Sequence, residues 1–263
     1  MARHVLCISS QVAYGPVGST AAAPALQAAG FTVLQVPTII LSNHPGLGKP
    51  SGVRLPAADI AAILKRLDEL DVLKDCVGAM TGYFADAAQV TAAATSIRAM
   101  RQANPALYIL VDPVLGDGEG LYVSIDVANA IRDELVPLAS SIAPNRLELA
   151  WLTGLPVMDI SDAVHAARTL ACEEVVATSI PAGDGALATL TITNFAQAEV
   201  ITRIKLHVPH GTGDFLSGLY LASRLNGYEP AQALQRSSAI LELAIARSLG
   251  EVALDIVGAL HDH

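Results

Sequence analysis

A loop near the carboxyl end of the chain carries residue types suited to phosphate chemistry. The stretch His210-Gly211-Thr212-Gly213-Asp214 leads into an apolar run at helical spacing, which predicts a helix over 214–225. Glycines let the backbone come close to a ligand, and the first amides of a helix have no internal partner, so this junction would attract an anion. A carboxylate there would repel that anion unless it has a task of its own. For Asp214 we consider two roles, proton acceptor from an attacking hydroxyl and ordinary N-cap.

A second group of acidic residues follows a predicted buried strand over 107–111. Asp112 ends that strand, and a proline and a glycine-rich loop with Asp117, Glu119 and Tyr122 come next. A buried carboxylate is unfavourable unless a cation or hydrogen bonds compensate it. Asp112, Asp117 and Glu119 could therefore bind a divalent metal, directly or through water. The alternative is that Asp112 caps the turn.

Glu148 could add a carboxylate to such a metal site. It follows a short predicted strand over 140–143 and Pro144-Asn145, and it stands in the first turn of a helix that should end near Gly154. The helix macrodipole favours acidic residues at this position and would by itself explain Glu148. Because Asp112 also follows a strand, the two carboxylates can meet at one edge of a sheet.

Other polar residues lie at the ends of the remaining strands or in the flap over 42–52. Ser10 ends the first predicted strand and could bind a ligand or bond to its own backbone as a loop hydroxyl. Tyr83 follows the strand over 76–80 and could lie flat on an aromatic ligand or roof the core. The flap is so rich in Gly, Pro and Ser that we predict irregular structure, with His44 either functional or merely solvated.

The elements that must position these residues alternate between strand and helix without a linker or repeat. We predict one α/β domain over 1–263, since 52% hydrophobic residues suffice to cover a sheet on both faces. Predicted strands cover 5–9, 31–36, 76–80, 107–111, 140–143 and 175–178, with an antiparallel pair over 187–193 and 199–204 at one sheet edge. Predicted helices cover about 20–29, 56–70, 86–103, 125–135, 214–225 and 231–248, followed by a last short helix.

The composition argues against several classes of partner. The net charge is −9 with 16 Lys plus Arg, so we expect no nucleic acid, and an anionic substrate would need helix termini and a metal ion. Cys7, Cys76 and Cys172 are far apart and typical of reduced core thiols. The first residues lack a signal-peptide pattern, and no apolar run reaches about 18 residues. We therefore expect a cytoplasmic protein without a membrane segment.

These segments together resemble the pyridoxal kinases, the vitamin B6 kinase branch of the ribokinase-like superfamily, over nearly the whole chain. The Gly211-Thr212-Gly213-Asp214 element belongs to the superfamily at large. The flap sequence Ser42-Asn43-His44 and the segment Asp112-Pro113-Val114-Leu115-Gly116-Asp117 are more specific and separate B6 kinases from sugar kinases. The remaining matches are Ile8-Ser9-Ser10-Gln11-Val12 with Gly15 and Val17-Gly18, Leu41 and Gly52, Gly82-Tyr83, Leu121-Tyr122-Val123, Pro144-Asn145 with Glu148-Leu149, and Leu152-Thr153-Gly154.

The resemblance implies a three-layer α/β/α sandwich with a mostly parallel central sheet, little or no lid domain, and usually a homodimer. It also implies that ATP phosphorylates the 5′-hydroxymethyl group of pyridoxal, and often of pyridoxine and pyridoxamine, to give the 5′-phosphate used in B6 salvage. Mg²⁺ is the implied cofactor. A requirement for K⁺ or another monovalent cation stays open.

The resemblance further assigns roles to matching positions. Asp214 would be the base, and the amides of Gly211, Thr212 and Gly213 would stabilise charge on the transferring phosphoryl group. Asp112 and Glu148 would organise Mg²⁺. The vitamer would contact Ser10, His44, Pro45, Gly46, Tyr83 and Asp214, and ATP would contact Asp112, Asp117, Tyr122, Ala143, Asn145, Glu148, Thr178, His210, Gly211, Thr212 and Gly213.

Four positions depart from the family pattern. Pro45 stands where many members carry a threonine that contacts substrate, and Pro50 replaces a common aromatic residue in the flap. Ser19 replaces a common asparagine, and Thr178 stands where some bacterial members have a lysine that contacts the nucleotide. These departures bear on vitamer preference and affinity, not on the reaction class. The alternatives are a hydroxymethylpyrimidine or sugar kinase of the same superfamily, and a B6-binding protein without catalytic activity.

Overall fold

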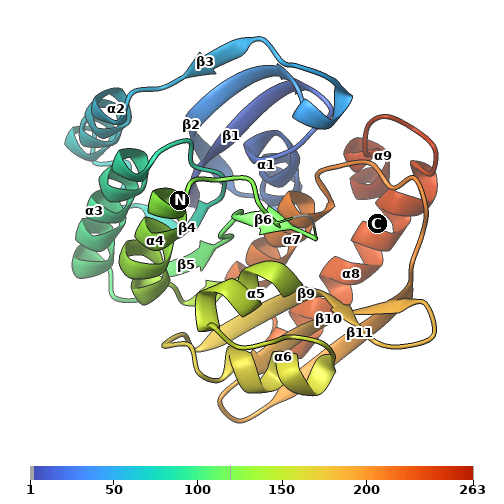
Figure 1. Ribbon diagram of the computed structural model, residues 1–263. Helices are drawn as coiled ribbons and strands as arrows, with labels where there is room; N and C mark the ends of the chain where they lie inside the picture. The colour runs from blue at the N-terminus through green and yellow to red at the C-terminus, as the bar shows by residue number, and fades with distance from the viewer. Residues whose placement is uncertain (1–2, 119, 263) are drawn as a thin grey trace.

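The computed structural model describes residues 3–118 and 120–262. Within these residues a nine-stranded sheet forms the centre, in the order β11-β10-β9-β8-β5-β4-β1-β2-β3 (Figure 1). The pairs from β2 through β1, β4, β5 and β8 to β9 are parallel, and β3, β10 and β11 are antiparallel to their neighbours. The strands are β1 His4–Tyr14, β2 Thr32–Asn43, β3 Gly52–Arg54, β4 Cys76–Thr81, β5 Tyr108–Val111, β8 Ser141–Ile142, β9 Glu174–Pro181, β10 Ala186–Thr193 and β11 Gln197–Arg203.

Helices cover both faces of this sheet and complete three layers (Figure 1). One face carries α2 Ala57–Glu69, α3 Ala87–Ala103, α4 Ile125–Ala130, α5 Arg146–Thr153 and α6 Ile160–Ala167. The other carries α1 Ser19–Ala28, α7 Thr212–Leu225, α8 Pro230–Arg247 and α9 Ile256–His261. No helix in the described part of the chain has both the length and the apolar character needed to cross a bilayer.

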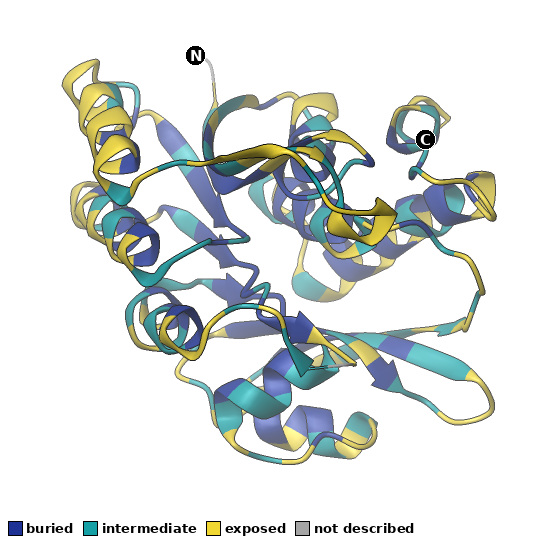
Figure 2. Ribbon diagram, turned by 45° about the horizontal axis from the view of Figure 1, so that its top comes forward, coloured by how far each residue is buried: buried dark blue, intermediate teal, exposed yellow. Residues whose placement is uncertain are grey.

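The apolar run of β1 shows why the first strand lies at the centre of the sheet. Leu6 and Ile8 pack into the core beneath α2–α6, whereas Val5 packs into the core beneath α1 and α7. A strand covered on both faces needs apolar residues at successive positions, so its sequence is continuous rather than alternating. In Figure 2 the central strands are dark blue and the outer faces of the helices are yellow. The expected mostly parallel sheet between two helical layers is confirmed, and a separate lid domain is absent from the described residues.

The structure confirms most of the predicted irregular flap and corrects the predicted acidic loop. The flap over 42–52 is the connection of a hairpin: β2 runs to Asn43, β3 begins at Gly52, and the residues between them are irregular apart from a 3₁₀ turn at Pro45–Leu47. Ser42 closes the hairpin, because its amide donates to the Ser51 carbonyl at 2.8 Å and its hydroxyl accepts from the Ser51 amide at 3.0 Å. The acidic loop after Asp112 likewise contains a small antiparallel ladder, with β6 at Gly116–Asp117 and β7 at Gly120–Leu121.

Helix boundaries also differ in two places. Helix α6 was not predicted, although Asp159 is an N-cap whose side chain accepts from the Asp162 amide at 2.9 Å. The predicted helix over 125–135 is α-helical only to Ala130 and continues as a π-turn at Ile131–Leu135 and a 3₁₀ turn at Val136–Leu138. Pro137 explains the ending, since proline cannot supply the amide that a longer helix requires.

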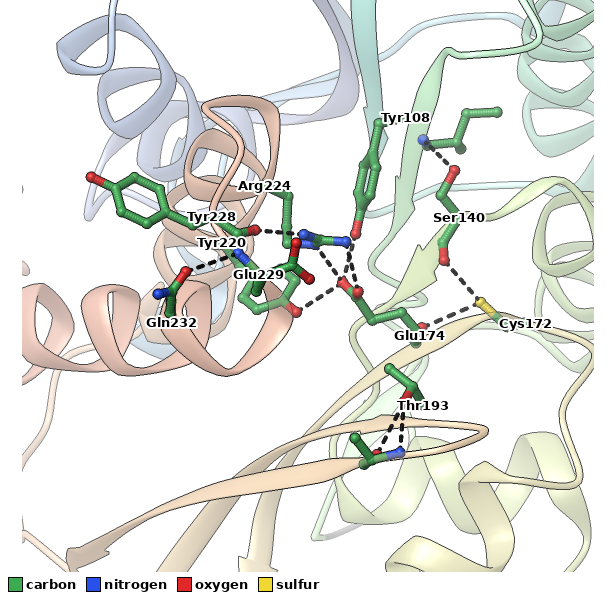
Figure 3. A network of polar contacts seen from close by, with 12 residues as sticks. Tyr108, Ser140, Cys172, Glu174, Thr193, Tyr220, Arg224, Tyr228, Glu229 and Gln232 are labelled. Carbon is green, nitrogen blue, oxygen red and sulfur yellow. Dashed lines mark hydrogen bonds and ion pairs between the residues drawn. The ribbon is translucent and has the colours of Figure 1, made fainter.

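A buried polar network holds the end of α7 against the sheet (Figure 3). Glu174, at the start of β9, accepts hydrogen bonds from Tyr108 at 2.6 Å and Tyr220 at 2.8 Å and pairs with Arg224 at 3.1 Å. Tyr108 begins β5, and Tyr220 and Arg224 lie on α7. The network therefore sits at the amino ends of the parallel strands. It fixes one end of α7 while the other end, with Asp214, reaches the opposite edge of the sheet.

Candidate active site

The start of α7 adjoins open space beside Gly213. Gly211 is the N-cap, with φ at 96°, and a Cβ there would lie 2.0 Å from the Pro16 carbonyl oxygen. Only glycine satisfies both conditions, so the 210–214 loop is seated tightly on the β1–α1 loop. A Cβ on Gly213, by contrast, would meet nothing within 4 Å. The first turn of α7 thus has room for an anion beside unpaired amides.

Asp214 lies in this first turn and is not the N-cap, so the N-cap alternative is wrong. Its carboxylate accepts hydrogen bonds from the backbone amide of Gly18 and from its own amide. Burial nevertheless raises the pKa of Asp214 to about 6 against the lowering effect of these two bonds. At neutral pH the group is mainly a carboxylate, and it is basic enough to accept the proton of an alcohol whose oxygen is forming a new bond.

Asp112 is buried at the carboxyl end of β5 and is anchored by α7. The Ser217 hydroxyl donates to Oδ2 of Asp112 at 2.8 Å, and the Val114 amide donates to the same carboxylate. The second bond is a turn cap, so the capping alternative describes part of what Asp112 does. Burial, followed by the charges of Asp214 and Glu148, raises the pKa of Asp112 well above its usual range. Val114 holds this turn at a φ of 41°, which is unusual for a β-branched residue.

Glu148 connects α5 with the acidic loop. It forms a capping box with Asn145, whose amide donates to Oε2 at 2.8 Å. Its Oε1 accepts from the amides of Leu115 at 2.8 Å and Gly116 at 3.4 Å. Burial raises the pKa of Glu148 to about 7, although these backbone bonds lower it, and Asp214 raises it further. Glu148 therefore does more than complement a helix dipole: it belongs with Asp112 and Asp214 to one cluster of mutually repelling carboxylates, hereafter the acidic cluster.

The acidic cluster suits a cation, but its side chains would supply only some of the ligands. Each of its carboxyl groups has a raised pKa, so the site lacks positive charge. Among residues 3–118 and 120–262, no three His, Cys, Asp or Glu side chains are grouped as metal ligands would be. Glu119, one of the candidate ligands, lies outside the described residues. Asp112 and Glu148 suit a hard cation that keeps water and phosphate oxygens as its other ligands.

The remaining residues predicted to contact ATP surround this cluster. Burial and the charges of Glu148 and Asp112 raise the pKa of the Tyr122 phenol, and Asp117 contributes to the same effect. The Asn145 side-chain amide donates to the Gly116 carbonyl at 2.7 Å, and the Asn145 backbone forms an isolated parallel β-bridge with Thr178. Thr178 in turn donates its amide to the Pro144 carbonyl at 2.9 Å, directly after the buried Ala143. The structure thus gathers residues from the ends of β5, β8 and β9 at one edge.

Ser10 and Tyr83 lie at the same edge: Ser10 belongs to β1, and Tyr83 follows the neighbouring strand β4 by two residues. Ser10 is buried within β1 and not in a loop, and its carbonyl accepts from the Ser19 hydroxyl at 2.8 Å. The backbone of Tyr83 is fixed twice, because its amide donates to Ser9 Oγ at 3.2 Å and its carbonyl accepts from Thr38 Oγ1 at 2.7 Å. The half-buried Tyr83 side chain therefore starts from a rigid backbone position.

The flap reaches the 210–214 loop through His44. Its Nδ1 accepts from the Gly46 amide at 3.1 Å across the turn that begins at Pro45. The His44 ring stacks on that of His210, with ring centroids 4.0 Å apart and an interplanar angle of 29°. His44 is half-buried, so the interpretation of a merely solvated histidine is wrong.

Sequence reasoning missed several residues that position the site. Ser217 is the clearest case, and its signal was a hydroxyl within the apolar run of α7, three residues after Asp214. Gly18 was noted only as part of the family pattern, and its contacts were not predicted: its amide donates to Asp214, and a Cβ there would lie 2.2 Å from the Ser10 hydroxyl oxygen. Ser9 and Thr38 support Tyr83 from two different strands. No local pattern identifies such long-range partners.

Comparisons with known proteins agree with this geometry. A family model described as phosphomethylpyrimidine kinase matches residues 54–254. The chain is 36% identical over 250 residues to a pyridoxine/pyridoxal/pyridoxamine kinase of Bordetella avium, covering 92% of this chain and 84% of that relative. It is 34% identical over 263 residues to a pyridoxal kinase of Rubrobacter xylanophilus, covering 95% and 91%.

A solved structure extends the likeness to three dimensions. The pyridoxal kinase of Leishmania donovani, in complex with ADP and pyridoxamine, has a TM-score of 0.91 with this chain at 26% identity. The match covers 98% of this chain and 95% of that one. The three-layer fold is thus shared along the whole length.

Proposed function

The chain belongs to the pyridoxal kinase family, and from that premise we propose that it transfers the γ-phosphoryl group of ATP to the 5′-hydroxymethyl group of pyridoxal. It is an ATP-dependent kinase of B6 vitamers, the class to which its relatives and structural neighbours belong. Pyridoxine and pyridoxamine are further substrates in this proposal. The single observation that carries it is Asp214, a weakly basic carboxylate in the first turn of a helix that has open space beside Gly213.

The chain's own groups would act as follows. The alcohol oxygen approaches the γ-phosphorus while Asp214 accepts its proton, and the bond between that phosphorus and the β,γ-bridging oxygen breaks to release ADP. The amides of Gly211, Thr212 and Gly213 stabilise the negative charge of the transferring group, which compensates for the shortage of basic side chains. Ser10, Tyr83 and the flap residues His44, Pro45 and Gly46 would hold the pyridine ring. Asp117, Tyr122, Ala143, Asn145, Thr178 and His210 would line the nucleotide.

Mg²⁺ is part of the proposal, held near Asp112 and Glu148. Bound there with ATP, it would neutralise phosphate charge and polarise the transferring group. The support is the acidic cluster, in which burial raises the pKa values of all three carboxyl groups and the charge of Asp214 further raises those of Asp112 and Glu148. The structure favours no particular monovalent cation.

We further propose that the whole chain acts as one domain in the cytoplasm, where ATP is available, and that it forms a homodimer. The continuous nine-stranded sheet with its two helical layers supports one domain. The exposed edge formed by β2 and β3 carries the apolar residues Ile40, 39% exposed, and Val53, 60% exposed, which a partner subunit would cover. Light scattering on the purified chain should give twice the monomer mass, and a monomer at micromolar concentration would contradict the homodimer.

A substrate panel tests the reaction. ADP release should be measured with ATP and Mg²⁺ against pyridoxal, pyridoxine, pyridoxamine, hydroxymethylpyrimidine and ribose under identical conditions. We expect turnover of at least one vitamer with a higher kcat/KM than either of the other alcohols. The family model's description favours hydroxymethylpyrimidine as the second candidate, and a higher kcat/KM with it would reverse the assignment. Vitamer binding without ADP release would identify a binding protein instead.

A further inference from the structure

Two histidines from distant segments meet at the rim of the site. His44 belongs to the flap, and His210 directly precedes Gly211, the N-cap of α7. Their rings stack with centroids 4.0 Å apart. A Cβ added to Gly46 would lie 2.5 Å from His210 Nε2, so the backbone of the flap turn touches the same ring. The flap and the 210–214 loop are thus joined by an aromatic ring and by a backbone contact.

The hydrogen bond at His44 defines the state of this contact. Its Nδ1 accepts from the Gly46 amide at 3.1 Å, so the His44 imidazole is neutral and carries its proton on Nε2. Burial and then the neighbouring His210 lower the pKa of His44, which keeps the ring neutral. A neutral ring held by a backbone bond gives His210 a fixed surface to stack on.

The β1–α1 loop forms the base on which both segments rest. A Cβ on Gly15 would lie 3.4 Å from Leu47 Cδ1 of the flap turn, and a Cβ on Gly211 would lie 2.0 Å from the Pro16 carbonyl oxygen. Little space remains between the three segments. A displacement of the flap would therefore displace the 210–214 loop, and a displacement of the loop would displace the flap.

We propose that His210 is a positioning residue that couples the flap to the 210–214 loop through its ring, so that nucleotide and vitamer each increase the affinity of the other. The inference rests on the proposed function, which puts the vitamer under the flap and the phosphates on the loop. It gives His210 a different task from direct contact with ATP, because one face of its ring is covered by His44. Thermodynamic linkage requires the effect to be equal in both directions.

Calorimetric binding of a non-hydrolysable ATP analogue, with and without saturating pyridoxine and Mg²⁺, tests the coupling without turnover. For the natural chain we expect each ligand to lower the Kd of the other by about tenfold. His210→Ala should reduce this factor to about one or two. His210→Phe, which keeps a ring, should retain most of the coupling. His210→Gln, which keeps size and polarity without a ring, should lose it.

A double-mutant cycle and a matched control separate stacking from general disturbance. His44→Ala should lose as much coupling as His210→Ala, and the double variant should lose no more than either one. The control is His207→Asn on the same segment, since His207 is exposed, has a φ of 58° that Asn tolerates, and should keep full coupling. Melting temperatures show which variants are folded.

Three results would overturn the inference: absence of coupling in the natural chain, full coupling in folded His210→Ala or His210→Gln, or equal loss in His210→Phe. Failure of the proposed function gives a different result. In that case the natural chain would release no ADP with any vitamer. A chain that turns over a vitamer but keeps its coupling in His210→Gln would retain the function and lose the inference.

Discussion

Ser217 Oγ donates a hydrogen bond of 2.8 Å to Oδ2 of Asp112, and it does so from the same helix that carries Asp214. Helix α7 therefore positions two of the three members of the acidic cluster, one directly and one through a hydroxyl. Its far end is held by Glu174 and Arg224. The placement of Asp112 and Asp214 thus depends on one helix.

Removing the Ser217 hydroxyl should weaken the site through Asp112. A hydrogen bond to a charged group contributes about 1.5–3 kcal/mol, so Ser217→Ala should lower kcat/KM for ATP by about tenfold or more. The control is Ser223→Ala, whose hydroxyl bonds only to the Leu219 carbonyl within α7. Equal activity of the two variants would contradict the anchoring role.

Asp214→Asn should remove the proton acceptor and keep the binding site. We expect kcat to fall by about 10²- to 10⁴-fold, the usual range for a positioned base. The Kd of ADP, measured by calorimetry, should stay within about threefold, since the amides of α7 remain in place. In the natural chain kcat/KM should rise with pH through the pKa of about 6, and this limb should vanish in the variant. Near-normal turnover would exclude the base role, and the exposed Asp68→Asn serves as control.

The acidic cluster should make the ligand-free protein less stable as pH rises. The folded pKa values of Glu148, about 7, and Asp214, about 6, lie above those of unfolded carboxyl groups. The folded state therefore binds more protons than the unfolded state between about pH 4 and pH 7, and the free energy of unfolding falls across this window. Asp112→Asn removes one repelling charge and should raise the melting temperature at pH 8 in EDTA, with little effect at pH 4.5. A stabilisation independent of pH would contradict this origin.

Two glycines of the 210–214 loop should respond differently to alanine. Gly211→Ala would force a side chain onto the Pro16 carbonyl at a positive φ, so the melting temperature should fall by several degrees. Gly213→Ala meets no neighbour and lies in a helical turn, so thermal stability should be unchanged or slightly higher. Its added methyl would project into the space meant for phosphate, and the KM for ATP should rise. Thermal unfolding and steady-state kinetics on both variants test this contrast.

The Glu174 network should matter for stability and not for chemistry. Glu174→Gln leaves Arg224 without its counter-ion, and breaking a buried pair costs about 3–5 kcal/mol, less here because Arg224 is partly exposed. Urea unfolding should show a clear loss of stability. Activity per folded molecule should stay within about twofold, because the network lies at the amino ends of the strands (Figure 3). A large loss of kcat at full folding would show that α7 transmits the change to Asp214.

Much of the fold was predictable because its signals are local. The continuous apolar run of β1 and the Asn145–Glu148 capping pattern each specify an element within a few residues. The irregular flap was predictable from its Gly, Pro and Ser content, whereas the hydrogen bonds between Ser42 and Ser51, which close the hairpin, have no local pattern. Helix α6 was overlooked although its N-cap, Asp159, was visible in the sequence.

The sequence by itself determined which residues stand at the carboxyl ends of strands and at the start of α7, and so which chemistry the chain can offer. Only the tertiary structure decided which of them meet. Asp112 and Ser217 are 105 residues apart, and His44 stacks on a histidine of the loop before α7. The periodicity of apolar residues in the sequence reports on one helix or strand at a time. The pKa of a carboxyl group depends instead on its burial and on charges that the folding of the whole chain brings close. The pKa of about 6 at Asp214 is therefore a property of the folded molecule.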